Sequence, residues 1–115
     1  MRRAEVKLND APLELAVDVA ETAQERSRGL LGRRACPVDE GFYFAPAYLV
    51  HTIGMRFPLD LVFCDRYGRV VSVRKHVPPG RLIFCRRGRG VLELAAGAVE
   101  ELLIAEGDRI SFSFI

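Results

Sequence analysis

Tryptophan is absent from this sequence of 115 residues, and cysteine occurs only three times, at Cys36, Cys64 and Cys85. An odd number of cysteines without a Cys-x-x-Cys pair does not match a disulfide framework or a structural zinc site. We therefore expect three reduced thiols, no metal site and no cofactor. Because free thiols are typical of a reducing compartment, the sequence predicts a cytoplasmic protein.

Long apolar runs are also missing from the chain. A membrane-spanning helix needs ~20 predominantly apolar residues, and no segment approaches this length. The first residues, Met1 to Val6, include two arginines and lack the apolar run of a signal peptide. We expect a soluble protein that has no signal peptide and contacts no membrane.

Neither sign of charge dominates, since 17 Lys and Arg residues against 15 Asp and Glu residues give a formal net charge of +2. Binding of nucleic acid needs a concentrated basic face, which this balance does not indicate. One segment, residues 81–90, is predicted to be a basic loop, in which Phe84 could stack on a base. Nucleic-acid binding through this loop is the weakest of three functional hypotheses.

Apolar and polar side chains alternate along much of the chain, which is the period of a half-buried β-strand. The pattern predicts a hairpin over residues 4–19, paired strands at 59–65 and 70–77, and a final strand at 110–114. A length of 115 residues and a hydrophobic content of 50% fit a single domain, residues 1–115. We predict a mainly β (α+β) fold, a compact antiparallel β-sandwich or barrel-like domain.

Two short helices are expected to accompany the strands. The first is predicted over residues 22–31, because Thr22 and Glu25 form a capping box and Gly32 suits a left-handed C-cap. Gly29 interrupts the last turns, where a glycine either lets the helix approach the sheet closely or ends it early. The second helix is predicted over residues 98–105.

The best candidate site is the segment 51–60, where polar and ionisable side chains run directly into the most apolar strand. In this segment Arg56 and Thr52 could bind an anion, Asp60 could orient them, and His51 could carry a proton. Glu93, in the middle of another apolar strand, completes the set. The candidate binding residues are His51, Thr52, Met55, Arg56, Asp60 and Glu93.

Two hypotheses use these residues. The first is a noncatalytic binding or accessory module, whose cleft near residues 51–60 holds a small anionic ligand or a segment of a protein partner. The second is a small hydrolase or transferase that uses His51, Asp60 and Glu93, with Arg56 as the charge stabiliser. An enzyme requires these side chains to converge in one concave site, whereas a binding module requires only the cleft and Arg56.

Asp60 and Glu93 also have structural interpretations. Asp60 could accept hydrogen bonds at the end of its strand. Glu93 would be solvated on an open face of its strand, or paired with an arginine or lysine if the strand is central. The chain contains no Gly-x-Ser-x-Gly elbow, phosphate loop or dinucleotide fingerprint that would point to a particular reaction.

Five ordered blocks of the sequence resemble the family known as domain of unknown function 192: residues 25–31, 41–44, 58–63, 91–97 and 107–108. The resemblance implies a small, mainly β domain, found in bacteria and archaea, without an established activity. Many members carry Trp-Met-Lys-Asn-Thr where this chain has His51-Thr52-Ile53-Gly54-Met55. A site built on that lysine cannot be carried over, although Arg56 could supply a cation from the next position.

Overall fold

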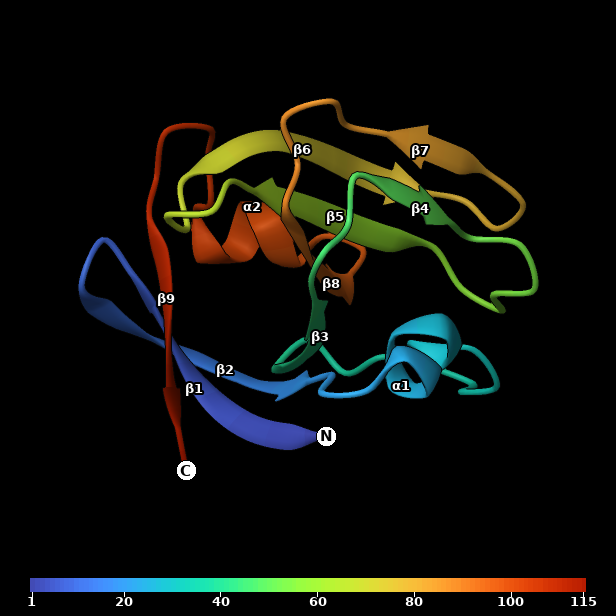
Figure 1. The fold of residues 1–115 in the computed structure, drawn as a ribbon, viewed down its shortest axis with the longest axis horizontal. Coiled ribbons are helices and arrows are strands. Elements are labelled where there is room, and N and C mark those ends of the chain that lie inside the picture. Colours follow the sequence, from blue (N-terminus) through green and yellow to red (C-terminus); the bar gives the residue numbers. More distant parts are fainter.

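The structure is a computed structural model that describes residues 1–115, and it consists of nine strands and two short helices (Figure 1). In chain order these are β1 (Arg2–Leu8), β2 (Ala11–Val19), α1 (Ala23–Arg28), β3 (Glu40–Phe44), β4 (Leu49–His51), β5 (Leu59–Cys64), β6 (Val70–Val77), β7 (Leu82–Phe84), β8 (Gly90–Ala95), α2 (Ala98–Leu102) and β9 (Ile110–Phe114). The mainly β prediction is therefore confirmed. Neither helix is long enough to cross a membrane.

Seven strands form one sheet in the order β6-β5-β8-β3-β2-β1-β9, and β4 and β7 form a separate two-stranded ribbon. The sheet does not close into a barrel. All its neighbouring strands are antiparallel except β2 and β3, which run parallel. The segment that contains α1 connects this parallel pair, and parallel neighbours require such a crossover. Figure 1 shows the β4–β7 ribbon beside β5 and β6, with α1 near one end of the molecule.

Two hydrophobic cores lie on opposite faces of the central strands. Along β5, Leu61 and Phe63 contribute to one core, whereas Val62 and Cys64 contribute to the other. All six residues of β5 are buried, as are all six of β8. Because successive side chains of a strand point to opposite faces, consecutive residues of β5 or β8 lie in different cores.

Helix α1 is shorter than predicted. The capping box of Thr22 and Glu25 is present, but the C-cap is Gly29 rather than Gly32. Gly29 has φ +50° and ψ −129°, a conformation that L-residues with a β-carbon rarely adopt. The prediction of a helix over residues 22–31 is thus wrong at its C-terminal end, and the early end that Gly29 permits is the one observed. Helix α2 likewise ends at Leu102, before the predicted residue 105.

The segment 81–90 is not simply a loop, because it contains β7 and leads into β8. A three-residue strand is too short to show a period of two, so the alternation rule could not find it. Thr52 connects the ribbon to the following chain: its hydroxyl donates to the Pro78 carbonyl at 2.8 Å and accepts from the Arg81 N–H at 2.9 Å. The ribbon therefore consists of two short strands, and the buried Thr52 connects the end of β4 to the segment that precedes β7.

Candidate functional site

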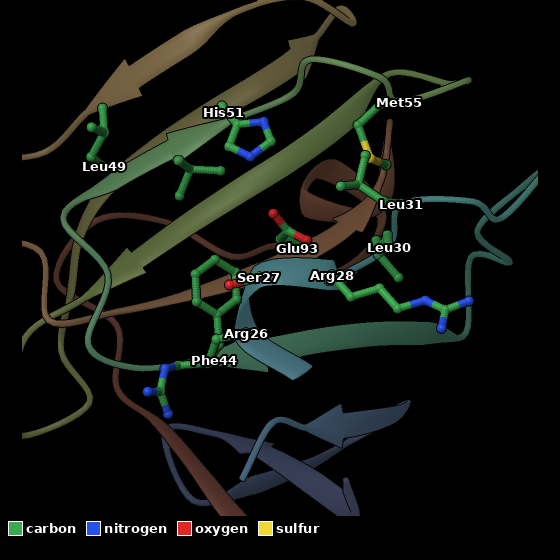
Figure 2. Close-up of a pocket in the computed structure, with 12 residues that line it drawn as sticks. Arg26, Ser27, Arg28, Leu30, Leu31, Phe44, Leu49, His51, Met55 and Glu93 are labelled. Atoms are coloured by element: carbon green, nitrogen blue, oxygen red, sulfur yellow. The ribbon is translucent and has the colours of Figure 1, made fainter. Parts of the chain in front are cut away.

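A cavity of about 250 Å³ lies between the end of α1 and strand β4, and β8 contributes Glu93 to its lining (Figure 2). We call it the α1–β4 cavity. Apolar side chains supply half of its lining, and the polar remainder includes two arginines and a histidine. Its lining includes Arg26, Arg28, Leu30, Phe44, His51 and Met55.

Glu93 is the most unusual residue of this cavity. It pairs in register with Phe42 of β3 and Leu61 of β5, and so shares a face with these two fully buried side chains. Only 5% of Glu93 is exposed. Its carboxylate has neither a hydrogen bond nor an ion pair within the protein, and burial raises its pKa to about 7.

The two arginines of the cavity lining do not neutralise Glu93. Arg26 and Arg28 come from α1, and neither takes part in an ion pair with any residue of the chain. Figure 2 shows both arginine side chains extending away from Glu93, whose carboxylate points into the space beneath His51. The cavity therefore has a buried acid on its inner side and two free guanidinium groups towards its rim.

Gly29 determines how closely the end of α1 approaches Glu93. A β-carbon built on Gly29 would lie 3.6 Å from Oε1 of Glu93 and 3.7 Å from the Phe42 ring. These are ordinary van der Waals distances, so any side chain here would occupy the space in front of the carboxylate. The glycine thus serves two purposes, since it ends the helix and leaves the acid open to the cavity.

Of the six residues predicted from the sequence, the structure brings three together. His51, Met55 and Glu93 line the α1–β4 cavity. His51 is exposed and Met55 is half-buried, so both lie towards its outer side. The α1–β4 cavity thus takes part of its lining from the first half of the segment 51–60 and none from the second half.

Thr52 and Asp60 are placed elsewhere, and both are fully buried. The Thr52 hydroxyl is occupied by the Pro78 and Arg81 backbone. Asp60 pairs in register with Leu94, whereas Glu93 pairs with Leu61, so the two carboxylates face opposite sides of the sheet.

The Asp60 carboxylate is also fully engaged by the backbone. Its Oδ1 accepts the N–H of His76 at 2.9 Å, and its Oδ2 accepts those of Gly97 and Val99, each at 3.0 Å. These bonds connect β5 to β6 and to the start of α2. The strand-end acceptor inferred from the sequence corresponds to this geometry.

Arg56 is exposed, forms no ion pair, and does not line the α1–β4 cavity. Together with the position of Asp60, this leaves the hydrolase or transferase arrangement unassembled: only His51 and Glu93 of its four residues reach one cavity. The solvated alternative for Glu93 is wrong, because the residue is buried. Its strand is central, yet the expected arginine or lysine partner is absent.

Sequence reasoning missed the contribution of α1 to the site. Arg26 and Arg28 were assigned only to a helix, yet they line the cavity with Glu93. The signal was available in the block 25–31, which is one of the five that carry the family resemblance. Because this block precedes Glu93 by more than sixty positions in the chain, only the fold could show that the two meet.

The basic segment 81–90 does not form one patch at a cavity. Arg81 lines a depression together with Arg74 and Lys75 of β6, whereas Arg89 lines a different one beside Arg66. No cluster of three or more His, Cys, Asp or Glu residues is placed to hold a metal ion. All three cysteines are free thiols, and burial raises the pKa of Cys64 to about 12, so this thiol stays protonated at neutral pH.

Comparison with known proteins agrees with this architecture. The model of the family DUF192, described as "Uncharacterized ACR", matches residues 4–112. The chain belongs to the DUF192 family. No curated protein matches the sequence.

Two solved structures resemble this DUF192 chain. One is a candidate transcription regulator from Sinorhizobium meliloti 1021, with a TM-score of 0.85 and 27% identity, covering 96% of this chain and 93% of that one. The other is a protein of unknown function from Novosphingobium aromaticivorans DSM 12444, with a TM-score of 0.79 and 21% identity, covering 96% of this chain and 84% of that one. The second likeness concerns the fold alone.

Proposed function

We propose that this protein is a noncatalytic binding module, and that its ligand brings a positively charged amine to Glu93 in the α1–β4 cavity. The observation that carries the proposal is the state of Glu93, which is 5% exposed and has no partner within the chain. A buried carboxylate is costly unless a cation or hydrogen-bond donors compensate it. An ammonium group would supply both the missing charge and the missing donors.

The size and lining of the cavity support a small ligand group. A volume of about 250 Å³ is below the range of roughly 300–1,000 Å³ typical of drug-sized pockets. Leu30, Phe44 and Met55 offer apolar surface for the methylene groups of an alkyl amine. The anionic ligand expected from the sequence is placed at the rim in this proposal, where Arg26 and Arg28 are free to bind a carboxylate.

The arrangement of acids favours binding over catalysis. Hydrolysis by paired carboxylates needs two acids on one substrate, and Asp60 lies on the opposite side of the sheet from Glu93. The Asp60 carboxylate is moreover occupied by three backbone donors. Glu93 therefore has no second acid beside it for hydrolysis, and a binding role does not require one.

Titration with n-butylamine, followed by protein NMR, tests the proposal. We expect saturable shifts of Met55 and of the residues beside Glu93, with a dissociation constant on the order of 1 mM, which corresponds to about 4 kcal/mol. 1-Butanol, which has a similar shape and no charge, should bind at least tenfold more weakly. Glu93→Gln should abolish the difference, whereas Glu106→Gln, at an exposed carboxylate, should not.

The pH dependence of amine binding provides a second criterion. Because the pKa of Glu93 is about 7, the carboxylate is mostly protonated at pH 5 and mostly ionised at pH 8. We expect the affinity for n-butylamine to rise at least tenfold between these two values. The other titratable or charged groups around the cavity are Arg26, Arg28, His51 and Cys36, so the His51→Gln variant is measured in parallel. An affinity for n-butylamine that changes neither with pH nor in the Glu93→Gln variant would disprove the proposal.

Direct recognition of DNA is not the function we favour. The Sinorhizobium meliloti protein is described as a candidate transcription regulator, and that description applies to that protein. Here the two helices have six and five residues, and the arginines of segment 81–90 are divided between two depressions. A ligand-binding module that acts beside a separate DNA-binding partner would suit these features better than a helix in the major groove.

A further inference from the structure

Strand β4 has a free edge at the α1–β4 cavity. In the β4–β7 ribbon, Val50 pairs with Ile83, and the flanking bonds are Cys85 N–H to the Tyr48 carbonyl at 2.7 Å and Thr52 N–H to the Arg81 carbonyl at 2.8 Å. Hydrogen-bonded and non-hydrogen-bonded pairs alternate in an antiparallel ladder. The N–H and C=O groups of the two intervening residues, Leu49 and His51, therefore point away from β7 and have no backbone partner.

This free edge borders the space that contains the unpaired acid. Leu49, Val50 and His51 all line the cavity, as does Glu93. Leu49 and His51 are exposed residues, so this edge of the ribbon lies at the surface of the protein. Val50 is only 3% exposed, and it packs in the same core as Leu61, whose face of the sheet Glu93 shares. An added strand would thus direct the side chain opposite Val50 towards Glu93.

We propose that an extended peptide segment of a partner protein pairs with the edge of β4 as a third, antiparallel strand and places one lysine side chain on Glu93. The inference rests on the function proposed above, because the lysine supplies the amine. β-Strand addition to an exposed edge is an established mode of peptide recognition, in which backbone bonds give affinity and alternate side chains give specificity. Antiparallel pairing is chosen because it is slightly more stable per residue than parallel pairing.

The charges and apolar groups around the edge define the remainder of the peptide. Side chains next to the lysine would point outward, beside exposed Leu49 and, across the ribbon, Phe84, so β-branched residues suit these positions. The following residues return to the cavity side, towards the free Arg26 and Arg28, and acidic residues suit these positions. The segment that fits is therefore acidic–apolar–Lys–apolar–acidic.

The other sheet edges lack this combination. β6 and β9 are the edge strands of the large sheet. A depression lies between β6 and the β7 side of the ribbon, but its charged lining consists of Arg74, Lys75 and Arg81, which would repel a basic segment. Only at β4 does a free edge lie against a buried acid without a partner, and this juxtaposition distinguishes it as the docking site.

The test uses the peptide acetyl-Glu-Val-Lys-Val-Glu-amide and the intact protein, with affinity measured by calorimetry at pH 8. We expect it to bind at least tenfold more tightly than n-butylamine. Replacing its lysine by norleucine should weaken binding at least tenfold, and Glu93→Gln in the protein should remove that difference. A norleucine peptide that binds the unaltered protein equally well would overturn the lysine assignment.

Backbone methylation of the peptide tests the edge pairing. In the proposed register the amides of both valines point to β4, whereas the lysine amide points away from it. N-methylation of the valines should therefore weaken binding at least tenfold, and N-methylation of the lysine should change it less than threefold. In the complex, the amide protons of Leu49 and His51 should also become protected from hydrogen exchange. Equal effects of the two methylations, without this protection, would overturn the edge pairing.

The two proposals fail in different ways. If n-butylamine binds at Glu93 but the peptide binds no more tightly and leaves Leu49 and His51 unprotected, the amine site stands and the peptide inference is wrong. If neither probe binds, both proposals are wrong. A peptide that binds and protects these amides independently of Glu93 would retain the docking edge and remove the lysine from it, which contradicts the proposal as stated.

Discussion

Asp60 and Glu93 lie on neighbouring strands, one step apart in register, and their carboxylates face opposite sides of the sheet. Asp60 is satisfied by three backbone N–H groups, whereas Glu93 has no partner. Two buried carboxylates at neighbouring positions of the sheet thus have different roles. On one side an acid holds the structure together, and on the other an acid is left for a ligand.

Replacing Asp60 should therefore affect stability and leave the site intact. In Asp60→Asn an amide nitrogen, which can only donate, must face at least one of the backbone donors from His76, Gly97 and Val99. Loss of such charge-assisted bonds in a buried position costs about 1.5–3 kcal/mol each. We expect the free energy of unfolding, measured with urea, to fall by at least about 2 kcal/mol.

The affinity of the folded Asp60→Asn variant for n-butylamine provides its control. The substitution lies on the opposite face from the α1–β4 cavity, so the affinity should change less than twofold under conditions where the variant is folded. A variant of unchanged stability with impaired amine binding would give Asp60 the functional role that its position argues against.

Thr52 should affect the stability of the protein, because its hydroxyl connects the β4–β7 ribbon to the neighbouring chain. Thr52→Val preserves the shape of the side chain but removes a hydroxyl that bonds both the Pro78 carbonyl and the Arg81 N–H, which then lose this partner at a partly buried site. An unsatisfied buried group costs about 1–3 kcal/mol. We expect a loss of that size in urea denaturation. Thr52→Ser, which retains the hydroxyl, should recover most of it, and no recovery would mean that the methyl group is the important part.

The long elements of the fold could be predicted because their pattern is local. Alternation marked the strand β5 and the hairpin of β1 and β2, and the capping box of Thr22 and Glu25 marked the start of α1. The end of α1 could not be fixed, because Gly29 and Gly32 are both suited to end a helix. Burial of Leu30, which is 1% exposed, accompanies the earlier end.

The site was predictable only in part, because its residues come from three distant segments. His51, Met55 and Glu93 were selected for their chemistry, but the sequence did not show that they converge. The same reasoning also selected Thr52 and Asp60, since a buried polar residue that bonds the backbone has the same sequence signature as a functional one. The two groups differ in whether the polar side chain is hydrogen-bonded to the backbone, and only the structure shows this.

Glu93 should make the protein less stable as the pH rises. The pKa of a glutamate in the unfolded chain is near 4.5, whereas burial raises that of Glu93 to about 7 in the folded protein. The folded state therefore holds more protons between these values, and the free energy of unfolding falls across that window. Since one pKa unit corresponds to ~1.4 kcal/mol, the loss is about 3 kcal/mol and is complete above pH 7.

Urea denaturation from pH 4.5 to 8, compared between the native protein and Glu93→Gln, measures this loss. Glutamine has a similar shape and does not ionise, so the variant should be more stable than the native protein by about 2–3 kcal/mol at pH 8, and the two should be nearly equal at pH 4.5. The comparison cancels the titration of other groups, such as Glu25, whose pKa is lowered by its hydrogen bond to the N-terminus. A constant difference across the whole range would show that Glu93 is ionised in the folded protein throughout.

Gly29 links the geometry of α1 to the ionisation of Glu93, and Gly29→Ala should reveal both. The positive φ of +50° should cost about 1–3 kcal/mol at any pH, because an L-residue is strained there. The new β-carbon would also lie 3.6 Å from Oε1 of Glu93, where it excludes water and raises the pKa of this carboxyl further. We therefore expect the destabilisation to be larger at pH 8 than at pH 5, as measured by urea denaturation.

The control is Gly107→Ala, at a glycine with φ +92° and no neighbour within 4 Å of the added carbon. Its free energy of unfolding should fall by the same amount at both pH values. If Gly29→Ala behaved like Gly107→Ala, or kept its extra loss at pH 8 when combined with Glu93→Gln, the glycine would serve only to end the helix.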